Sequence, residues 1–210
     1  MITLGQRFTD AVDYARVAHA GQVRKGAGTP YLYHLLAVSS LVLEYGGDED
    51  QAIAGLLHDV IEDCGEQHDP ILLARFGESV IEIVRDCTDG TEESKKQATS
   101  PEEKQADWWN RKLKYIEHLR KEPDRSLLVS GCDKLHNARA IIEDLQNPEV
   151  GIAVFDRFTA GRQATLRYYE SISRVLAARQ MPMDPSFDRL VELMHQLAGE
   201  STRLPLEHEV

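Results

Sequence analysis

The chain has 210 residues, with 24 lysines and arginines against 35 aspartates and glutamates, which gives a formal net charge of −11. This negative balance argues against a protein that coats nucleic acid, because sequence-independent binding relies on cations that neutralise phosphates. A hydrophobic fraction of 42% and a charged fraction of 28% are typical of a globular chain and exclude a disordered or collagenous one. Function must therefore be inferred from motifs.

Neither a secretory signal nor a membrane span is predicted. The amino terminus lacks a basic segment followed by an apolar one, and no apolar run reaches about 18 residues. The three cysteines are widely spaced without a Cys-x-x-Cys pair, which argues against a disulfide framework or a zinc knuckle. We therefore expect a cytoplasmic protein with reduced thiols.

Apolar residues at spacings of three and four predict helices along the chain, separated by loops that contain glycine and proline. In chain order the expected helices cover about residues 5–20, 31–45, 48–63, 70–76, 78–87, 101–121, 123–145, 159–178 and 185–199. Loops are expected at 22–30 and 88–99. No strand is predicted, so we expect an all-α fold: one compact helical bundle over residues 1–200 with a flexible C-terminal tail at 201–210.

The third expected helix carries a cluster of ionisable residues. Four of them fall on one arc of a helical wheel, opposite a strongly apolar arc: His58, Asp59, Glu62 and Asp63. Gly55 lies one turn below this arc, and its missing side chain is expected to leave space over that face. Three carboxylates on one helix face repel one another, and a cation beside them would remove the repulsion.

A solvated acidic face is the alternative interpretation of an isolated His-Asp pair. Two further residues favour a metal site. His34 directly precedes an apolar run, and Asp133 follows the apolar stretch 127–132, where a lone carboxylate is costly unless it is paired or metal-bound. Two imidazoles and two carboxylates suit Mn, Fe, Co or Zn rather than Ca or Cu(I), and the residues do not select among these metals.

The order His34, His58-Asp59, Asp133 resembles the H…HD…D metal signature of HD-domain phosphohydrolases. Residues 24–34, 58–63 and 133–139 resemble more narrowly the hydrolase domain of Rel/SpoT proteins and the small alarmone hydrolases. Members of that family remove the 3′ pyrophosphate from (p)ppGpp with Mn²⁺. The resemblance therefore implies an HD-domain bundle, one divalent metal, Mn²⁺ before others, and a nucleotide substrate that yields GDP or GTP and pyrophosphate.

The resemblance also implies roles for individual residues. The implied metal ligands are His34, His58, Asp59 and Asp133. The implied catalytic pair, Glu62 and Asp63, would orient and deprotonate the attacking water, since a carboxylate one helical turn from the ligands can accept the proton. The implied substrate-binding residues are Arg24, Lys25, Asn137 and Tyr168. For Arg24 and Lys25 the alternative is a pair of solvated charges, and for Tyr168 it is core packing.

Several departures keep alternatives open. Leu35 stands where the family usually has proline, and the segment 91–121 is longer than in compact relatives, so the adenine alarmone ppApp stays open beside ppGpp. Two further histidines, His68 and His118, raise the alternative of an HD site with two metals. We interpret both as surface or core histidines, because His118 has no histidine or acidic partner one turn away and His68 lies in a polar loop.

Two other functions are weighed against the alarmone hydrolase. One is an HD-type nucleotidase acting on other (deoxy)nucleotides, and the other is a non-catalytic module that senses alarmones. The 24–25 loop and the 133–139 segment favour the hydrolase over the nucleotidase. Because all four ligands and the acidic pair are present, an enzyme is favoured over a sensor. We expect no nucleic-acid or membrane partner, and the sequence does not indicate the oligomeric state.

Overall fold

The computed structural model describes residues 2–24, 26, 28–88 and 101–200. Within these ranges every regular element is helical, and the only pairing of extended residues is an isolated bridge between Val23 and Pro30. The predicted all-α fold is therefore confirmed. Most of the loop expected at 88–99, the tail expected at 201–210 and the substrate-binding candidate Lys25 lie outside the described residues.

The described residues form two compact units. The first unit contains residues up to 88 together with 121–136, and the second contains 101–120 together with 137–200. Helix α8 (Asp124–Gln146) contributes to both. Each unit is considered separately below.

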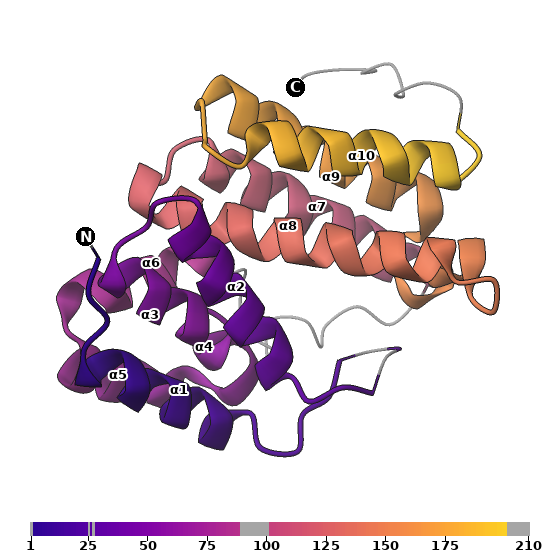
Figure 1. Cartoon of the computed structure of the whole chain (residues 1–210). Coiled ribbons are helices and arrows are strands. Elements are labelled where there is room, and N and C mark those ends of the chain that lie inside the picture. The colour runs from indigo at the N-terminus through magenta and orange to yellow at the C-terminus, as the bar shows by residue number, and fades with distance from the viewer. Residues whose placement is uncertain (1, 25, 27, 89–100, 201–210) are drawn as a thin grey trace. The chain divides into compact units, whose positions relative to one another are not determined.

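The first unit is built around α3, against which three other helices pack (Figure 1). Its elements in chain order are α1 (Gln6–Ala18), α2 (Leu32–Glu44), α3 (Glu49–Leu57), α4 (Val60–Cys64), η1 (Glu66–His68), α5 (Asp69–Phe76) and α6 (Glu78–Cys87). Helix α3 contacts α1, α2 and α6, and its residues from Gln51 to Leu57 are all buried. His58, which directly follows α3, is thereby buried and only 2% exposed.

The start of α3 is fixed by a capping box. The carboxylate of Asp48 accepts a hydrogen bond from the Gln51 backbone N–H, and the Gln51 side chain accepts one from the Asp48 N–H, both at 3.0 Å. These two bonds satisfy amide groups that have no partner within the helix. The acidic residues expected to open this helix therefore do so through a defined cap.

The helix expected over residues 48–63 is interrupted where its ionisable residues begin. Helix α3 ends at Leu57, the chain turns through His58 and Asp59 (φ −94°, ψ −3°), and α4 begins at Val60. The Nδ1 atom of His58 lies 2.9 Å from the Gly55 carbonyl oxygen, so the side chain takes part in closing the last turn of α3. The single-helix prediction was wrong here, and a wheel drawn through residue 63 does not describe the side-chain directions.

Gly55 has a different role from the one expected of it. A Cβ atom added there would lie 3.2 Å from Ser39 Cα and 3.3 Å from Ser39 N, both backbone atoms of α2. The missing side chain thus allows α2 and α3 to approach closely instead of leaving space above the ionisable residues. This close approach brings the start of α2 near the end of α3.

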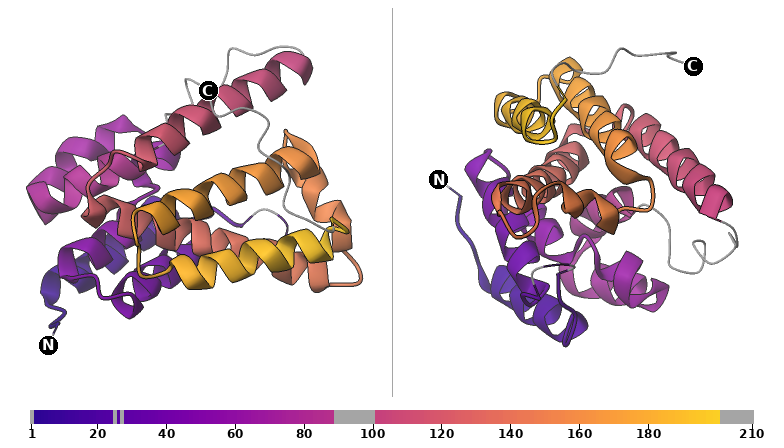
Figure 2. Two further views of the ribbon diagram at one scale, coloured as in Figure 1. Left: turned by 90° about the horizontal axis from the view of Figure 1, so that it is seen from above. Right: turned by 90° about the vertical axis from the view of Figure 1, so that its right-hand side faces the viewer.

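The second unit is organised around α9. Its elements are α7 (Pro101–Leu119), the later part of α8, η3 (Gly151–Arg157), α9 (Gly161–Ala178) and α10 (Asp184–Leu197). Helix α9 packs against α7, η3 and α10, and its pairing with α10 is visible in both views of Figure 2. Phe187, Leu166 and Ile172 are fully buried, and the Phe187 ring stacks on Tyr169 at 6.2 Å.

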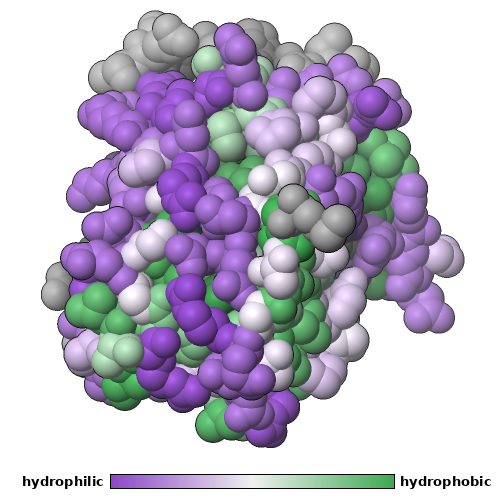
Figure 3. Space-filling model, turned by 60° about the vertical axis from the view of Figure 1, so that its left-hand side comes forward, coloured by the Kyte–Doolittle hydropathy of each residue, from purple (hydrophilic) through white to green (hydrophobic). Residues whose placement is uncertain are grey.

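The surface carries both polar and apolar side chains. On the face drawn in Figure 3, hydrophilic residues cover the larger part and hydrophobic residues lie in separate patches between them. Exposed apolar residues of this kind are normal in a folded protein. No helix among the described residues is both long and apolar enough to cross a membrane.

Candidate metal centre

Four ionisable side chains from four places in the first unit converge on one point. They are His34 on α2, His58 after α3, Asp59 before α4 and Asp133 on α8. The Nε2 atom of His58 lies 3.0 Å from Asp59 Oδ2 and 3.7 Å from Asp133 Oδ1. The Nε2 atom of His34 lies 3.2 Å from Asp133 Oδ1 and 3.7 Å from Asp59 Oδ2. We refer to these four residues as the His/Asp cluster.

The geometry of the His/Asp cluster fits a divalent cation. A metal with bonds of about 2.0–2.2 Å to nitrogen and oxygen holds neighbouring ligand atoms about 2.8–3.6 Å apart, close to the separations observed here. Three of the residues, His34, His58 and Asp59, offer ligand atoms within 4.8 Å of one another. The Nε2 atom of His58 is one of the described buried atoms that make no well-directed hydrogen bond. A buried ring nitrogen without such a bond, facing two carboxylates, is what a metal would satisfy.

The surroundings of the His/Asp cluster shift the pKa values of all four of its members. Burial lowers the pKa of His34, although Asp133 opposes the shift. Burial would also lower the pKa of His58, but the charges of Asp59 and Asp133 outweigh it and raise this pKa. Burial tends to raise the pKa of Asp59 and Asp133, yet the histidines and Lys134 hold both carboxyl groups ionised. Asp59 and Asp133 are therefore negatively charged and can attract a cation.

Three residues that sequence reasoning did not assign contact the His/Asp cluster. The Tyr31 hydroxyl donates to Asp59 Oδ2 at 2.6 Å, and the Lys134 ammonium lies 2.6 Å from Asp133 Oδ2. The Nδ1 atom of His136 lies 2.8 Å from the Nδ1 atom of His34. All three belong to segments that resemble the family, 24–34 and 133–139. The contacts of Tyr31 and His136 join residues 28 and 102 positions apart, so no local pattern shows them, whereas Lys134 is the direct neighbour of Asp133.

The two acidic candidates, Glu62 and Asp63, lie on α4, three and four residues after Asp59. Burial and the nearby charge of Asp59 raise the pKa of Asp63, which makes its carboxylate a better proton acceptor. The Gln22 amide donates to Asp63 Oδ2 at 2.8 Å and fixes that carboxylate. Glu62 is partly buried beside it. Both carboxylates are thus placed next to the His/Asp cluster without belonging to it.

The substrate-binding candidates have different outcomes. The Arg24 guanidinium lies 5.9 Å from the centre of the Tyr31 ring, which connects the 22–30 turn to the His/Asp cluster through the Tyr31 hydroxyl. Asn137 follows Asp133 by one turn of α8. Tyr168 is buried on α9 in the second unit, with the Lys112 ammonium 5.2 Å from its ring centre. Its position relative to the His/Asp cluster stays a prediction.

The two additional histidines are also placed by the structure. The Nδ1 atom of His68 is hydrogen-bonded to the Tyr14 hydroxyl at 2.6 Å, and His118 lies on α7 in the second unit. Neither belongs to the group of described residues that could hold a metal. The contacts of His68 therefore agree with its interpretation as a structural histidine.

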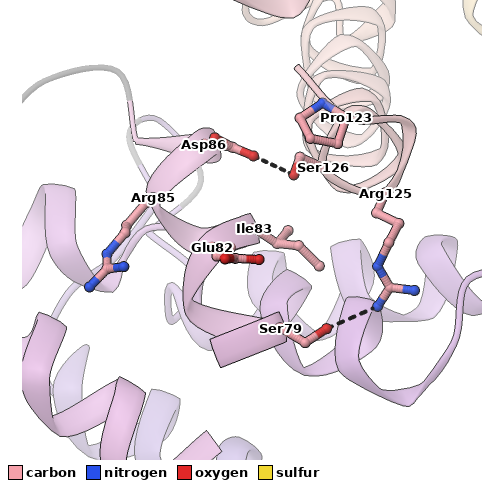
Figure 4. A pocket seen from close by; sticks show the side chains of 8 residues that line it. All are labelled: Ser79, Glu82, Ile83, Arg85, Asp86, Pro123, Arg125 and Ser126. Carbon is pink, nitrogen blue, oxygen red and sulfur yellow. Dashed lines mark hydrogen bonds between the residues drawn. The ribbon is translucent and has the colours of Figure 1, made fainter. Parts of the chain in front are cut away.

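A separate cavity of about 410 Å³ lies between α6 and the start of α8 in the first unit (Figure 4). Four of its polar side chains are hydrogen-bonded in pairs: Ser126 donates to Asp86 at 2.6 Å and Arg125 donates to Ser79 at 3.2 Å. Arg125 is also paired with Asp48. These internal contacts make the cavity part of the packing between α6 and α8.

Comparisons with known proteins agree with this geometry. The family model described as the HD domain matches residues 11–165. The chain is 37% identical over 137 residues to a Synechocystis protein named probable guanosine-3′,5′-bis(diphosphate) 3′-pyrophosphohydrolase. The matched segment covers 65% of this chain and 16% of that protein. It is 34% identical over 133 residues to the guanosine-3′,5′-bis(diphosphate) 3′-pyrophosphohydrolase of Xenopus tropicalis, which covers 62% of this chain and 66% of that one.

One solved structure is similar over nearly the whole chain. It is described as a metazoan ortholog of SpoT that hydrolyses ppGpp, and it matches with a TM-score of 0.67 and 25% identity over 95% of this chain and 99% of its own. By contrast, the chain spans only 16–18% of the length of the long bacterial relatives that it matches. Since the family model covers more than half of the residues, the chain belongs to the HD-domain family of metal-dependent hydrolases.

Proposed function

We propose that this protein hydrolyses the 3′-pyrophosphate of ppGpp and pppGpp and releases GDP or GTP together with pyrophosphate. The observation that carries the proposal is the likeness to a ppGpp-hydrolysing protein over 95% of this chain and 99% of the other, which is a match between whole domains. The two curated relatives described above carry names for the same reaction. We further propose that residues 1–200 act as one functional HD domain, since the family model includes residues of both compact units.

In the proposed reaction, water attacks the phosphorus atom bonded to the 3′ oxygen. The bond between phosphorus and the 3′ oxygen breaks, that oxygen takes up a proton, and pyrophosphate is released. His34, His58, Asp59 and Asp133 would hold one divalent metal. We propose Mn²⁺ because the resemblance to the Rel/SpoT hydrolases implies it, and the mixed nitrogen and oxygen donor set accepts this metal among others. When bound, this metal supplies a Lewis acid that polarises the phosphoryl group and lowers the pKa of water.

The chain's own residues would carry the proton and hold the substrate. Asp63, whose pKa is raised by burial and by Asp59, and its neighbour Glu62 would accept the proton of the attacking water. Arg24 and Lys25 would contact the phosphates or the base, and Asn137 and Tyr168 the nucleoside. The three cysteines, all within the described residues, form no disulfide, which agrees with the cytoplasmic setting that we propose.

The test is to incubate metal-stripped protein with ppGpp and, separately, ppApp, with and without Mn²⁺, and to resolve the products by anion-exchange chromatography. We expect Mn²⁺-dependent formation of GDP and pyrophosphate from ppGpp, and the ppApp reaction measures how strictly the base is selected. Intact ppGpp in the presence of bound Mn²⁺ would contradict the proposal. Cleavage of ordinary nucleotides alone would instead indicate a nucleotidase, and tight ppGpp binding without cleavage would indicate a sensor.

A further inference from the structure

The contact between His34 and His136 is unusual because it joins two imidazole rings through the same ring atom. Their Nδ1 atoms are 2.8 Å apart and the ring centres 4.8 Å apart, although the residues are separated by 102 positions in the sequence. His34 is 1% exposed and His136 is 6% exposed, so water does not compete for this bond. A hydrogen bond between two ring nitrogens requires a hydrogen on one and a lone pair on the other.

The position of His34 in the His/Asp cluster decides which nitrogen carries the hydrogen. Its Nε2 atom faces the carboxylates of Asp133 and Asp59, at 3.2 Å and 3.7 Å. A metal bound there needs the lone pair of Nε2, so the hydrogen of a neutral His34 ring must lie on Nδ1. His34 then donates through Nδ1, and His136 must accept through its own Nδ1.

His58 is held in the same Nδ1–H form by a different partner. Its Nδ1 atom faces the Gly55 carbonyl oxygen at 2.9 Å, and a carbonyl can only accept, so the lone pair of His58 Nε2 also faces the His/Asp cluster. We propose that His136 is a positioning residue that holds His34 in its Nδ1–H form and in the orientation required for metal binding. This inference rests on the metal site of the proposed function and adds a residue to which no role was assigned.

Packing alone is the competing explanation for His136. Its ring also contacts the Tyr33 ring edge-on, with 5.3 Å between ring centres. Two substitutions separate the explanations. His136→Phe retains an aromatic ring for Tyr33 and removes the acceptor, whereas His136→Asn removes the ring and places an amide oxygen where Nδ1 was.

The experiment measures Mn²⁺ binding to both variants and to the unmodified protein by titration calorimetry. We expect His136→Phe to bind Mn²⁺ about 10–100-fold more weakly, the usual cost of losing the outer partner of a ligating histidine, and His136→Asn to stay within about threefold. Unchanged affinity in His136→Phe would overturn the proposal. Equal weakening in the two variants would overturn it as well, because the acceptor would then make no difference.

A second measurement does not depend on how well the variants fold. In the unmodified protein loaded with diamagnetic Zn²⁺, long-range ¹H–¹⁵N spectra of the imidazole rings report which nitrogen carries the hydrogen. We expect hydrogen on Nδ1 of His34 and on Nε2 of His136, and the reverse assignment would overturn the proposal. A protein that binds Mn²⁺ as expected but leaves ppGpp intact would refute the proposed substrate and leave the role of His136 standing.

Discussion

The part of the chain that the structure describes includes a buried group of histidine and carboxylate in each compact unit. The His/Asp cluster of the first unit contains two imidazoles and two carboxylates, whereas the second unit contains a single pair, His195 on α10 and Glu170 on α9. The atoms of this pair, His195 Nε2 and Glu170 Oε1, are 2.9 Å apart, and both side chains are less than 5% exposed. By distance and burial alone the two groups look alike.

The difference between them is charge and the number of converging atoms. In the pair, a single imidazole faces a single carboxylate. In the His/Asp cluster, both imidazoles use Nδ1 for other partners and point Nε2 at two ionised carboxylates. A bound metal needs the lone pairs of both Nε2 atoms, so both rings are then neutral and Lys134 offsets only one of the two negative charges. The other charge is costly in a buried site unless a cation compensates it. A buried histidine next to a carboxylate thus indicates a metal only where such an excess remains.

The largest expected effect comes from removing a carboxylate of the His/Asp cluster. Asp59→Ala should weaken Mn²⁺ binding by more than about 100-fold, beyond the loss caused by an outer-shell partner, and should abolish turnover with it. Calorimetry and the ppGpp assay measure the two effects. Asp13→Ala removes an exposed carboxylate, 68% accessible, from α1 and serves as the control. Strong Mn²⁺ binding by Asp59→Ala would show that the cluster resembles the Glu170 pair after all.

The next effect separates metal binding from proton transfer. Glu62→Gln leaves the His/Asp cluster intact and removes a carboxylate on α4, so we expect turnover to fall about 10²–10⁴-fold while Mn²⁺ affinity changes little. Glu66→Gln makes the same chemical change four residues later, at an exposed position of η1, and should leave turnover unchanged. Near-normal turnover of Glu62→Gln would refute its role as proton acceptor.

Substitutions in the His195–Glu170 pair of the second unit should change stability rather than Mn²⁺ binding. His195→Phe leaves the buried Glu170 carboxylate without this partner, and we expect the free energy of unfolding to fall by about 3–5 kcal/mol. Urea denaturation measures the loss. Replacing both residues, His195→Phe with Glu170→Leu, should recover most of it, because an apolar pair needs no compensation. If the double variant is no more stable than the single one, the contact is not a simple balanced pair.

The helices were largely predictable from the sequence, and the reasons for the exceptions are specific. Periodic apolar residues and the Pro-containing starts of α5 and α10 mark those helices locally. The break at His58-Asp59 was missed because apolar residues continue through Val60 and Ile61, so periodicity does not register a turn closed by the His58 side chain. Gly55 was misread because its neighbour is the backbone at Ser39, which no wheel includes.

The sequence indicated the candidate metal ligands but not the residues that contact them. His34, His58, Asp59 and Asp133 could be selected because ionisable residues beside apolar runs stand out in the sequence. Tyr31 and His136 stand in the same segments, but a tyrosine or histidine in a helix gives no local sign of its partner. Their bonds to Asp59 and His34 cross 28 and 102 residues. These groups meet because α2 packs against α3 and Asp133 of α8 lies beside His34 and His58.

The smallest effect concerns Asp48, an exposed carboxylate that caps α3 and pairs with Arg125 at 2.7 Å. Asp48→Ala removes both contacts, whereas Asp48→Asn keeps the cap and loses only the charge. We expect Asp48→Ala to be less stable than Asp48→Asn by about 1 kcal/mol in urea denaturation, and Asp48→Asn to differ little from the unmodified protein because exposed ion pairs contribute little.

The pH dependence of the Asp48→Asn comparison gives a further check. Partial burial raises the pKa of Asp48, but Arg125 and the Gln51 N–H outweigh it and hold the pKa below its usual range. A carboxyl group whose pKa is lower in the folded state stabilises the fold above the unfolded value of about 3.9, and this contribution disappears as pH falls through the folded value. The small advantage over Asp48→Asn should therefore be constant above about pH 5 and vanish in acid. An advantage that grows on acidification would show that Arg125 does not stabilise the charged form of Asp48.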